Sequence, residues 1–288
     1  MSNASTPRPE IFSTIQARDF AVAAAAPSVW ARLYANGALR KTLLLCVLAV
    51  AWEAYARALD NPLLFPPLTA TLAALARSVL SGELPSAAVY TLSLLFKGYA
   101  AGLAIAALLT AFASMSRIGA DLLETLTAMF NPLPSIALLP LALIWFGLGE
   151  ASVIFVLIHA VLWAVALNTF SGFQSLSPTL KMVGRNYGLS GAGFVVRILI
   201  PGAFPSILTG LKVGWAFAWR TLIAAELVFG VSSGEGGLGW YIFENKNQLL
   251  IPEVFAGLLT VIVFGLFVEN FIFRIIEDRT VRRWGMAT

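Results

Sequence analysis

The segment from Ser152 to Phe170 reads SVIFVLIHAVLWAVALNTF and contains no Asp, Glu, Lys or Arg. Its apolar residues follow one another without the alternation of a barrel strand, so the pattern favours a helix. A bilayer core needs roughly 20 apolar residues in helical form. Five further apolar runs meet this requirement, at about 42–59, 87–113, 122–147, 203–230 and 254–275. The sequence therefore predicts an all-α membrane protein with about six transmembrane helices.

The composition of the whole chain also favours a lipid environment. Hydrophobic residues make up 59% of the sequence and charged residues 12%, whereas soluble proteins carry about 25% charged residues. The net charge of +4 is spread over the ends of the apolar runs rather than gathered in one patch, which argues against a nucleic-acid partner. The single cysteine, Cys46, excludes an intrachain disulfide framework.

Lys and Arg are distributed unevenly over the segments that connect the apolar runs. With the N-terminus placed in the cytoplasm, most of them fall inside, and only Arg57, Arg77 and Lys246 fall outside. By the positive-inside rule this predicts a multi-pass protein of the bacterial inner membrane with both termini cytoplasmic. Residues 1–40 would form a cytoplasmic arm, either a helix along the membrane surface or an unstructured tail. Residues 41–288 would form the transmembrane domain.

The segment 171–201, here called loop 171–201, is predicted to be cytoplasmic and is too patterned for a simple turn. Ser177 or Thr179 can cap a short helix that begins near Pro178 and ends at Gly188. A second short helix would begin at Ser190 or Gly191 and run to Ile200, before Pro201. Two short helices with a glycine joint would form a rigid projection that transmits force to a partner.

The spacing within this loop resembles a known pattern. Gly188 is followed by nine residues and then by Ile198-Leu199-Ile200-Pro201. Permeases of binding-protein-dependent importers carry Glu-Ala-Ala, three residues, Gly, nine residues and Ile-x-Leu-Pro, and this chain is similar to them. The positions of the acidic triplet hold Met182-Val183-Gly184 instead. The stretches Asn131-Pro132-Leu133-Pro134 and Ala225-Glu226-Leu227 are similar to the nitrate, sulfonate and taurine subgroup.

The resemblance implies a type I (MetI-like) ABC importer permease fold. It further implies a second permease copy in a homodimer, cytoplasmic ATP-binding subunits that hold ATP and Mg, and an extracytoplasmic solute-binding protein. The solute would be a small anion such as nitrate, a sulfonate or taurine, translocated by alternating access. This chain has no Walker sequence, one histidine and no metal-spaced Cys/His group, so we expect a subunit without catalysis, cofactor or metal.

Two sets of residues are candidates for function. The residues expected to couple the loop to the ATPase are Lys181, Met182, Val183, Gly184, Arg185, Asn186, Tyr187, Gly188, Leu189 and Pro201. The alternative is an ordinary basic loop that obeys the positive-inside rule. The residues expected to line the substrate pathway are Asn131, Lys212, Trp219, Arg220 and Glu226. For Lys212, Arg220 and Glu226 the reason is that an ionisable group at membrane depth costs at least about 2.5–3.5 kcal/mol and usually faces a pathway or a partner.

Several alternatives stay open at this point. Lys212 could reach the cytoplasmic interface, Arg220 could pair with Glu226, and Asn131 could cap an interrupted helix. Lys97 could line a cavity or form a structural ion pair, and the lone His159 is more typical of a packing residue than of a ligand. The cluster Gly234–Gly239 would form a tight extracytoplasmic turn. For the whole chain, the competing hypothesis is a secondary transporter or channel without an ATPase partner.

Overall fold

The computed structural model describes residues 36–229 and 236–285. Most of the predicted N-terminal arm, residues 1–40, lies outside the described residues. So does Gly234, the first residue of the predicted turn Gly234–Gly239. The chain divides into two compact units, residues 1–51 and 52–288. In the first unit the described residues begin α2 (Gly37–Leu59). The Asn36 side chain caps this helix, because its Oδ1 accepts hydrogen bonds from the amides of Ala38 at 3.0 Å and Leu39 at 3.3 Å.

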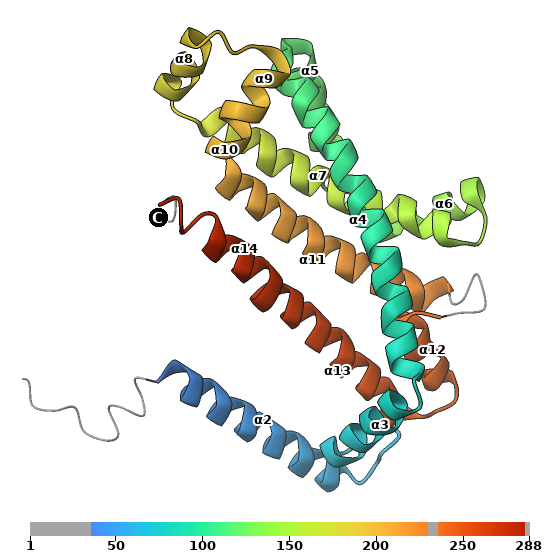
Figure 1. The fold of residues 1–288 in the computed structure, drawn as a ribbon. Coiled ribbons are helices and arrows are strands. Elements are labelled where there is room, and N and C mark those ends of the chain that lie inside the picture. The colour runs from blue at the N-terminus through green and yellow to red at the C-terminus, as the bar shows by residue number, and fades with distance from the viewer. Residues whose placement is uncertain (1–35, 230–235, 286–288) are drawn as a thin grey trace, which may run out of the picture. The chain divides into compact units, whose positions relative to one another are not determined.

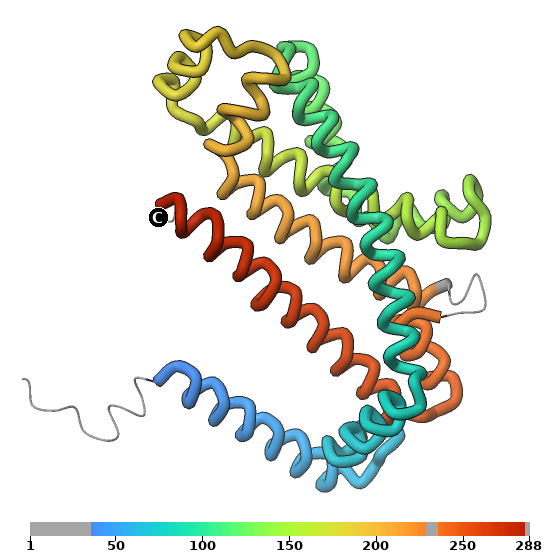
Figure 2. The backbone as a smooth tube through the Cα atoms, in the orientation of Figure 1, coloured from blue at the N-terminus to red at the C-terminus, as the bar shows by residue number. Residues whose placement is uncertain are grey.

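Helices alone make up the regular structure of the described part of the second unit (Figures 1 and 2). They are α3 (Leu68–Leu80), α4 (Glu83–Met115), α5 (Arg117–Phe130), η1 (Ser135–Leu138), α6 (Leu139–Phe146), α7 (Glu150–Ser175), α8 (Pro178–Asn186), α9 (Gly191–Phe194), η2 (Val195–Leu199), α10 (Ile200–Gly202), α11 (Phe204–Phe229), α12 (Leu238–Asn247), α13 (Ile251–Phe267), η3 (Val268–Phe273) and α14 (Arg274–Arg279).

Within residues 36–229 and 236–285, four helices are long and apolar enough to cross a membrane: α2, α4, α7 and the continuous stretch Ile251–Arg279. Two bent pairs bring the number to six if each is one span, which agrees with the prediction. The predicted span 122–147 is one of these pairs, because α5 and the η1–α6 stretch meet at 87°. Pro132 and Pro134 lie in the break, where they cannot donate backbone hydrogen bonds.

The core forms around α7, which packs against α4 and α11. Both α4 and α11 approach α7 closely, because each has a pair of glycines four residues apart on the side that faces α7. A Cβ atom at Gly98 of α4 would stand 2.6 Å from Leu157 Cβ, and one at Gly102 would stand 2.8 Å from Val161 Cβ. On the other side, a Cβ atom at Gly210 of α11 would stand 2.9 Å from Asn168 Cβ, and one at Gly214 would stand 3.0 Å from Val165 Cγ2. Small residues at this spacing let membrane helices pack with their backbones close together.

Two short helices, α3 and α12, were not anticipated from the apolar runs. Both pack against α13. They are joined by a buried hydrogen bond of 2.7 Å between Ser78 Oγ and Tyr241 Oη. Burial raises the pKa of the Tyr241 hydroxyl above its ordinary value.

Candidate functional site

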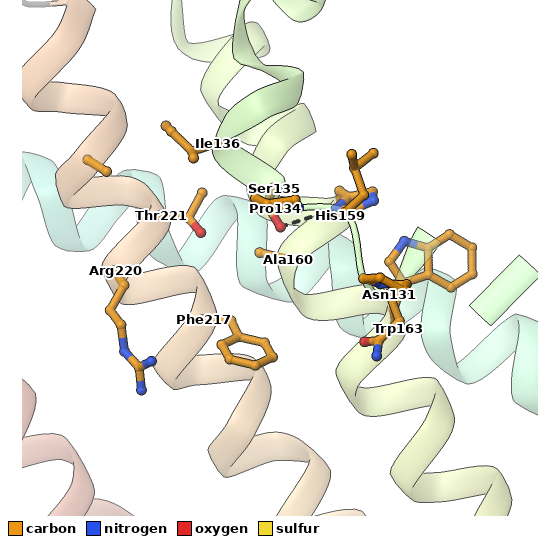
Figure 3. Close-up of a pocket in the computed structure, with 13 residues that line it drawn as sticks. Asn131, Pro134, Ser135, Ile136, His159, Ala160, Trp163, Phe217, Arg220 and Thr221 are labelled. Atoms are coloured by element: carbon orange, nitrogen blue, oxygen red, sulfur yellow. Dashed lines mark hydrogen bonds between the residues drawn. The ribbon is translucent and has the colours of Figure 1, made fainter. Parts of the chain in front are cut away.

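A cavity of about 310 Å³ opens at the break in the third apolar run (Figure 3). The break itself supplies one wall, α7 a second and α11 a third. The lining residues are Asn131, Pro132, Leu133, Pro134, Ser135, Ile136, His159, Ala160, Trp163, Phe217, Arg220, Thr221 and Ala224. Two predicted pathway residues, Asn131 and Arg220, are therefore brought to one cavity although 89 positions separate them in the sequence (220 − 131).

Polar groups of α7 and of the break meet at this cavity. Ser135 Oγ lies 3.1 Å from His159 Nδ1, as the dashed line in Figure 3 shows. The His159 ring also packs edge-on against Phe130 and Trp163, and Phe130 stacks on Trp163 with centroids 5.4 Å apart. Buried His159 Nε2 and Trp163 Nε1 have no hydrogen-bond partner among the described residues. His159 is therefore a hydrogen-bonded packing residue, as the sequence favoured, and it also lines the cavity.

Arg220 is the cationic group of this cavity. Its guanidinium lies over the Phe217 ring, with Cζ 5.9 Å from the centroid. Neither Glu226 nor any other carboxylate of the described residues forms an ion pair with it. The alternative in which Arg220 pairs with Glu226 is therefore wrong for this structure. An arginine that lines a cavity and has no ion-pair partner among the described residues is suited to binding an anion.

The other predicted pathway residues lie elsewhere. Lys212 and Trp219 line a second cavity of about 110 Å³, which Arg220 also borders. The Lys212 ammonium lies 2.5 Å from Glu277 Oε2, so this lysine is paired with the last helix. Lys97 likewise forms an ion pair, at 2.6 Å from Glu150 Oε2.

Glu226 lies in a buried hydrogen-bond network at the start of α12. Its carboxylate accepts from Thr91 Oγ1 at 2.9 and 3.0 Å and from the Gly239 amide at 2.8 Å. Thr91 Oγ1 in turn accepts from the Leu238 amide at 2.8 Å. These two amides belong to the first turn of α12, which has no helical partner for them. The network therefore ties α4, α11 and α12 together, and Glu226 caps α12 from a neighbouring helix.

Loop 171–201 forms two short helices. Ser177 Oγ accepts from the Leu180 amide at 3.3 Å and caps α8, which begins at Pro178. Gly188 follows α8 with φ +74°, and the Leu189 amide reaches back to the Gly184 carbonyl at 3.1 Å. This is the left-handed ending that favours glycine. The cap at Ser177 and the glycine joint agree with the prediction.

The second helix of the loop differs from the prediction. It begins at Gly191 but continues past Ile200 through Pro201 to Gly202, as α9, η2 and α10. The π-helical segment η2 ends at Leu199, two residues before Pro201, whose ring has no N–H to donate. The chain then turns by 79° into α11.

Gly184 of α8 is buried between the two short helices, while most of its helix is exposed. Met182 is 55% exposed, Val183 43% and Tyr187 82%. Lys181 Nζ donates to the Gln174 carbonyl at 3.0 Å. The exposed side of α8 is therefore apolar and basic, and the packing of Gly184 against the second helix holds α8 in place.

Sequence reasoning predicted Asn131 and Arg220 at the pathway but not the other lining residues, among which the polar and aromatic ones are Ser135, His159, Trp163, Phe217 and Thr221. One signal was present, because the only histidine lies in an apolar run and the only Asn-Pro-x-Pro break lies in the run before it. Trp163, Phe217 and Thr221 are typical of any apolar helix, and only the packing of α7 against α11 places them at the cavity.

Comparison with known proteins identifies the chain. Residues 98–285 match the family described as the inner membrane component of binding-protein-dependent transport systems. A putative ABC transporter permease of Methanocaldococcus jannaschii is 30% identical over 234 residues, 80% of this chain and 86% of the relative. A putative aliphatic sulfonates transport permease of Escherichia coli is 35% identical over 49% of this chain and 51% of its own. A nitrate import permease of Synechocystis is 31% identical over 61% and 62%.

These matches decide against the hypothesis of a secondary transporter or channel. They imply an ATP-binding subunit, which hydrolyses ATP on a separate chain, and a solute-binding protein as partners. The chain belongs to the family of binding-protein-dependent transport system inner membrane components, and it is the multi-pass, non-catalytic permease subunit of an ABC importer.

Proposed function

We propose that this permease imports a small solute with an oxyanion group, either nitrate or a sulfonate such as taurine, through the cavity that Arg220 lines. The observation that carries the proposal is Arg220, which lines the cavity and forms no ion pair with a described carboxylate. The planar guanidinium fork matches the oxygen atoms of sulfonate and nitrate. Asn131 and Ser135 add uncharged hydrogen-bonding groups, and no Asp or Glu is among the described lining residues.

The relatives named for sulfonate and nitrate transport support the same solute class. Asn131 remains a proposed pathway residue at this cavity, and Lys212 and Trp219 at the neighbouring one. Glu226 borders a smaller cavity of about 30 Å³, where its proposed contribution is to hold the wall in place.

The test is solute uptake by the complete transporter, reconstituted in proteoliposomes with its ATP-binding subunit and solute-binding protein. Arg220→Gln should lower uptake of the radiolabelled anion at least about tenfold, equivalent to about 1.4 kcal/mol. Arg220→Lys keeps the charge but loses the fork, so it should retain part of the uptake. Arg279→Gln is the matched control, because Arg279 is exposed in α14 away from the cavity. Normal uptake by the Arg220→Gln variant would refute the proposal.

We propose further that loop 171–201 couples the permease to the ATP-binding subunit on the cytoplasmic side, with both termini also cytoplasmic. ATP and Mg would be held by that subunit, and a second copy of this permease would complete the membrane pore. The exposed surface of Lys181–Leu189 supports this role, because α8 is held in one position. Ser177 caps its start, Gly188 turns the chain after its end, and Gly184 packs against the second helix. Pro201 contributes to the turn into α11.

Cysteine labelling tests the orientation. With Cys46 replaced by serine, a cysteine introduced by Tyr187→Cys should react with a membrane-impermeant maleimide only when the cytoplasmic face is open to the reagent. A cysteine at exposed Glu244 should react only from the opposite face. Labelling of both from the same side would overturn the orientation.

A further inference from the structure

Loop 171–201 has a one-sided charge. It contains Lys181, Arg185 and Arg197 and no Asp or Glu. The positive-inside rule accounts for the basic residues of a cytoplasmic loop, but acidic residues contribute little to that rule. Membrane topology therefore does not explain why acidic residues are absent.

The geometry points to a specific use of this charge. We propose that the ATP-binding subunit presents an acidic groove to α8, in which a carboxylate of that subunit pairs with Arg185. The proposal rests on the proposed docking of loop 171–201 and adds the chemistry of the surface that receives it.

Arg185 is the basic side chain best placed for such a contact. It lies in the last turn of α8 and is exposed, and no carboxylate of the described residues forms an ion pair with it. Lys181, by contrast, already donates to the Gln174 carbonyl within the chain. An arginine that is left without an internal counter-ion is available for a carboxylate on a partner.

The neighbours of Arg185 on α8 favour a protein partner over a lipid surface. Met182 and Tyr187 are 55% and 82% exposed, and Tyr, Met and Arg are enriched in the centres of protein interfaces. Their helix is already ordered, because Ser177 caps its start and Gly184 packs so close to the second helix that a Cβ atom at this position would stand 2.8 Å from Ile198 Cγ1. A preorganised surface loses little entropy on binding a complementary groove.

The experiment measures binding of the ATP-binding subunit to the full-length permease in detergent, at 50 and 300 mM salt. Arg185→Glu should weaken binding at least tenfold at low salt, with a smaller loss for Arg185→Gln. Charge reversal of one acidic residue in the groove of the ATP-binding subunit should restore binding to the Arg185→Glu variant. Arg279→Glu is the matched control outside the loop and should bind as the wild type does. Gel filtration of each variant checks that it inserts and folds.

Cross-linking separates this inference from the docking on which it rests. A Tyr187→Cys permease that cross-links to the ATP-binding subunit, combined with unchanged binding of the Arg185→Glu variant, would overturn the acidic groove and leave docking intact. Absence of any cross-link would overturn both. If Arg185→Glu instead weakens binding only to vesicles containing phosphatidylglycerol, the counter-ion is a lipid headgroup and the inference is wrong.

Discussion

Gly184 of α8 lies directly against Ile198 of η2. A Cβ atom at position 184 would stand 2.8 Å from Ile198 Cγ1 and 2.9 Å from Phe194 Cε2. Real side chains essentially never approach so closely, so this glycine sets the distance between the two short helices of loop 171–201.

Gly184→Val should therefore force the two helices apart. Overpacking of this kind costs about 1–3 kcal/mol, and we expect faster hydrogen exchange of the α8 amides and less solute transported per ATP hydrolysed. Gly193→Val is the matched control in the same loop, since a Cβ atom there would meet nothing within 4 Å. Equal exchange rates in the two variants would contradict the prediction.

Gly188 tests backbone conformation separately from space. Its φ is +74°, and a Cβ atom there would also meet nothing within 4 Å, so any cost of substitution is conformational. Gly188→Val should destabilise the joint by about 1–2 kcal/mol and uncouple ATP hydrolysis from uptake while the permease still inserts. Gly188→Asn should be milder, because asparagine tolerates the left-handed region. Normal coupling in the valine variant would count against a rigid joint.

Thr91 tests the network that holds α12. Thr91→Val removes the hydroxyl that donates to Glu226 and accepts from the Leu238 amide. A buried amide without a partner costs about 1–3 kcal/mol, so the purified permease should melt at a lower temperature and the α12 amides should exchange faster. Thr110→Val is the control, because the buried Thr110 hydroxyl bonds only the Ala106 carbonyl of its own helix. A larger effect of the control would exclude the proposed role of the network.

Gly102 tests the close contact between α4 and α7. Gly102→Val would place side-chain atoms within about 3 Å of Val161 and should cost about 1–3 kcal/mol, measured by thermal unfolding in detergent. Ala100→Val, at an exposed position two residues earlier, should leave the melting temperature nearly unchanged. Similar stability of both variants would show that the helices can separate here at no cost.

The amino-acid sequence determined which segments are apolar enough to span a membrane, where α8 begins and where loop 171–201 turns at Gly188. The predicted start of the loop at residue 171 was early, because α7 continues to Ser175. These features depend on residues that are close together in the sequence: the long apolar runs, the start of α8 at Ser177–Pro178 and the turn at Gly188. They can therefore be predicted without knowledge of the tertiary contacts. Proline is a local signal of the same kind: Pro132 and Pro134 indicate an interruption of the third run, but they do not give its angle of 87°.

Only the tertiary structure decided which polar side chains meet. Lys212 and Arg220 lie on one helix, yet the first pairs with Glu277 and the second borders the cavity beside Asn131. Glu226 binds Thr91, which is 135 positions away in the sequence. A membrane-spanning helix is apolar on every side, so its sequence carries no stripe that marks the face toward each neighbour. The helix packing, set partly by glycines against α7, brings these partners together.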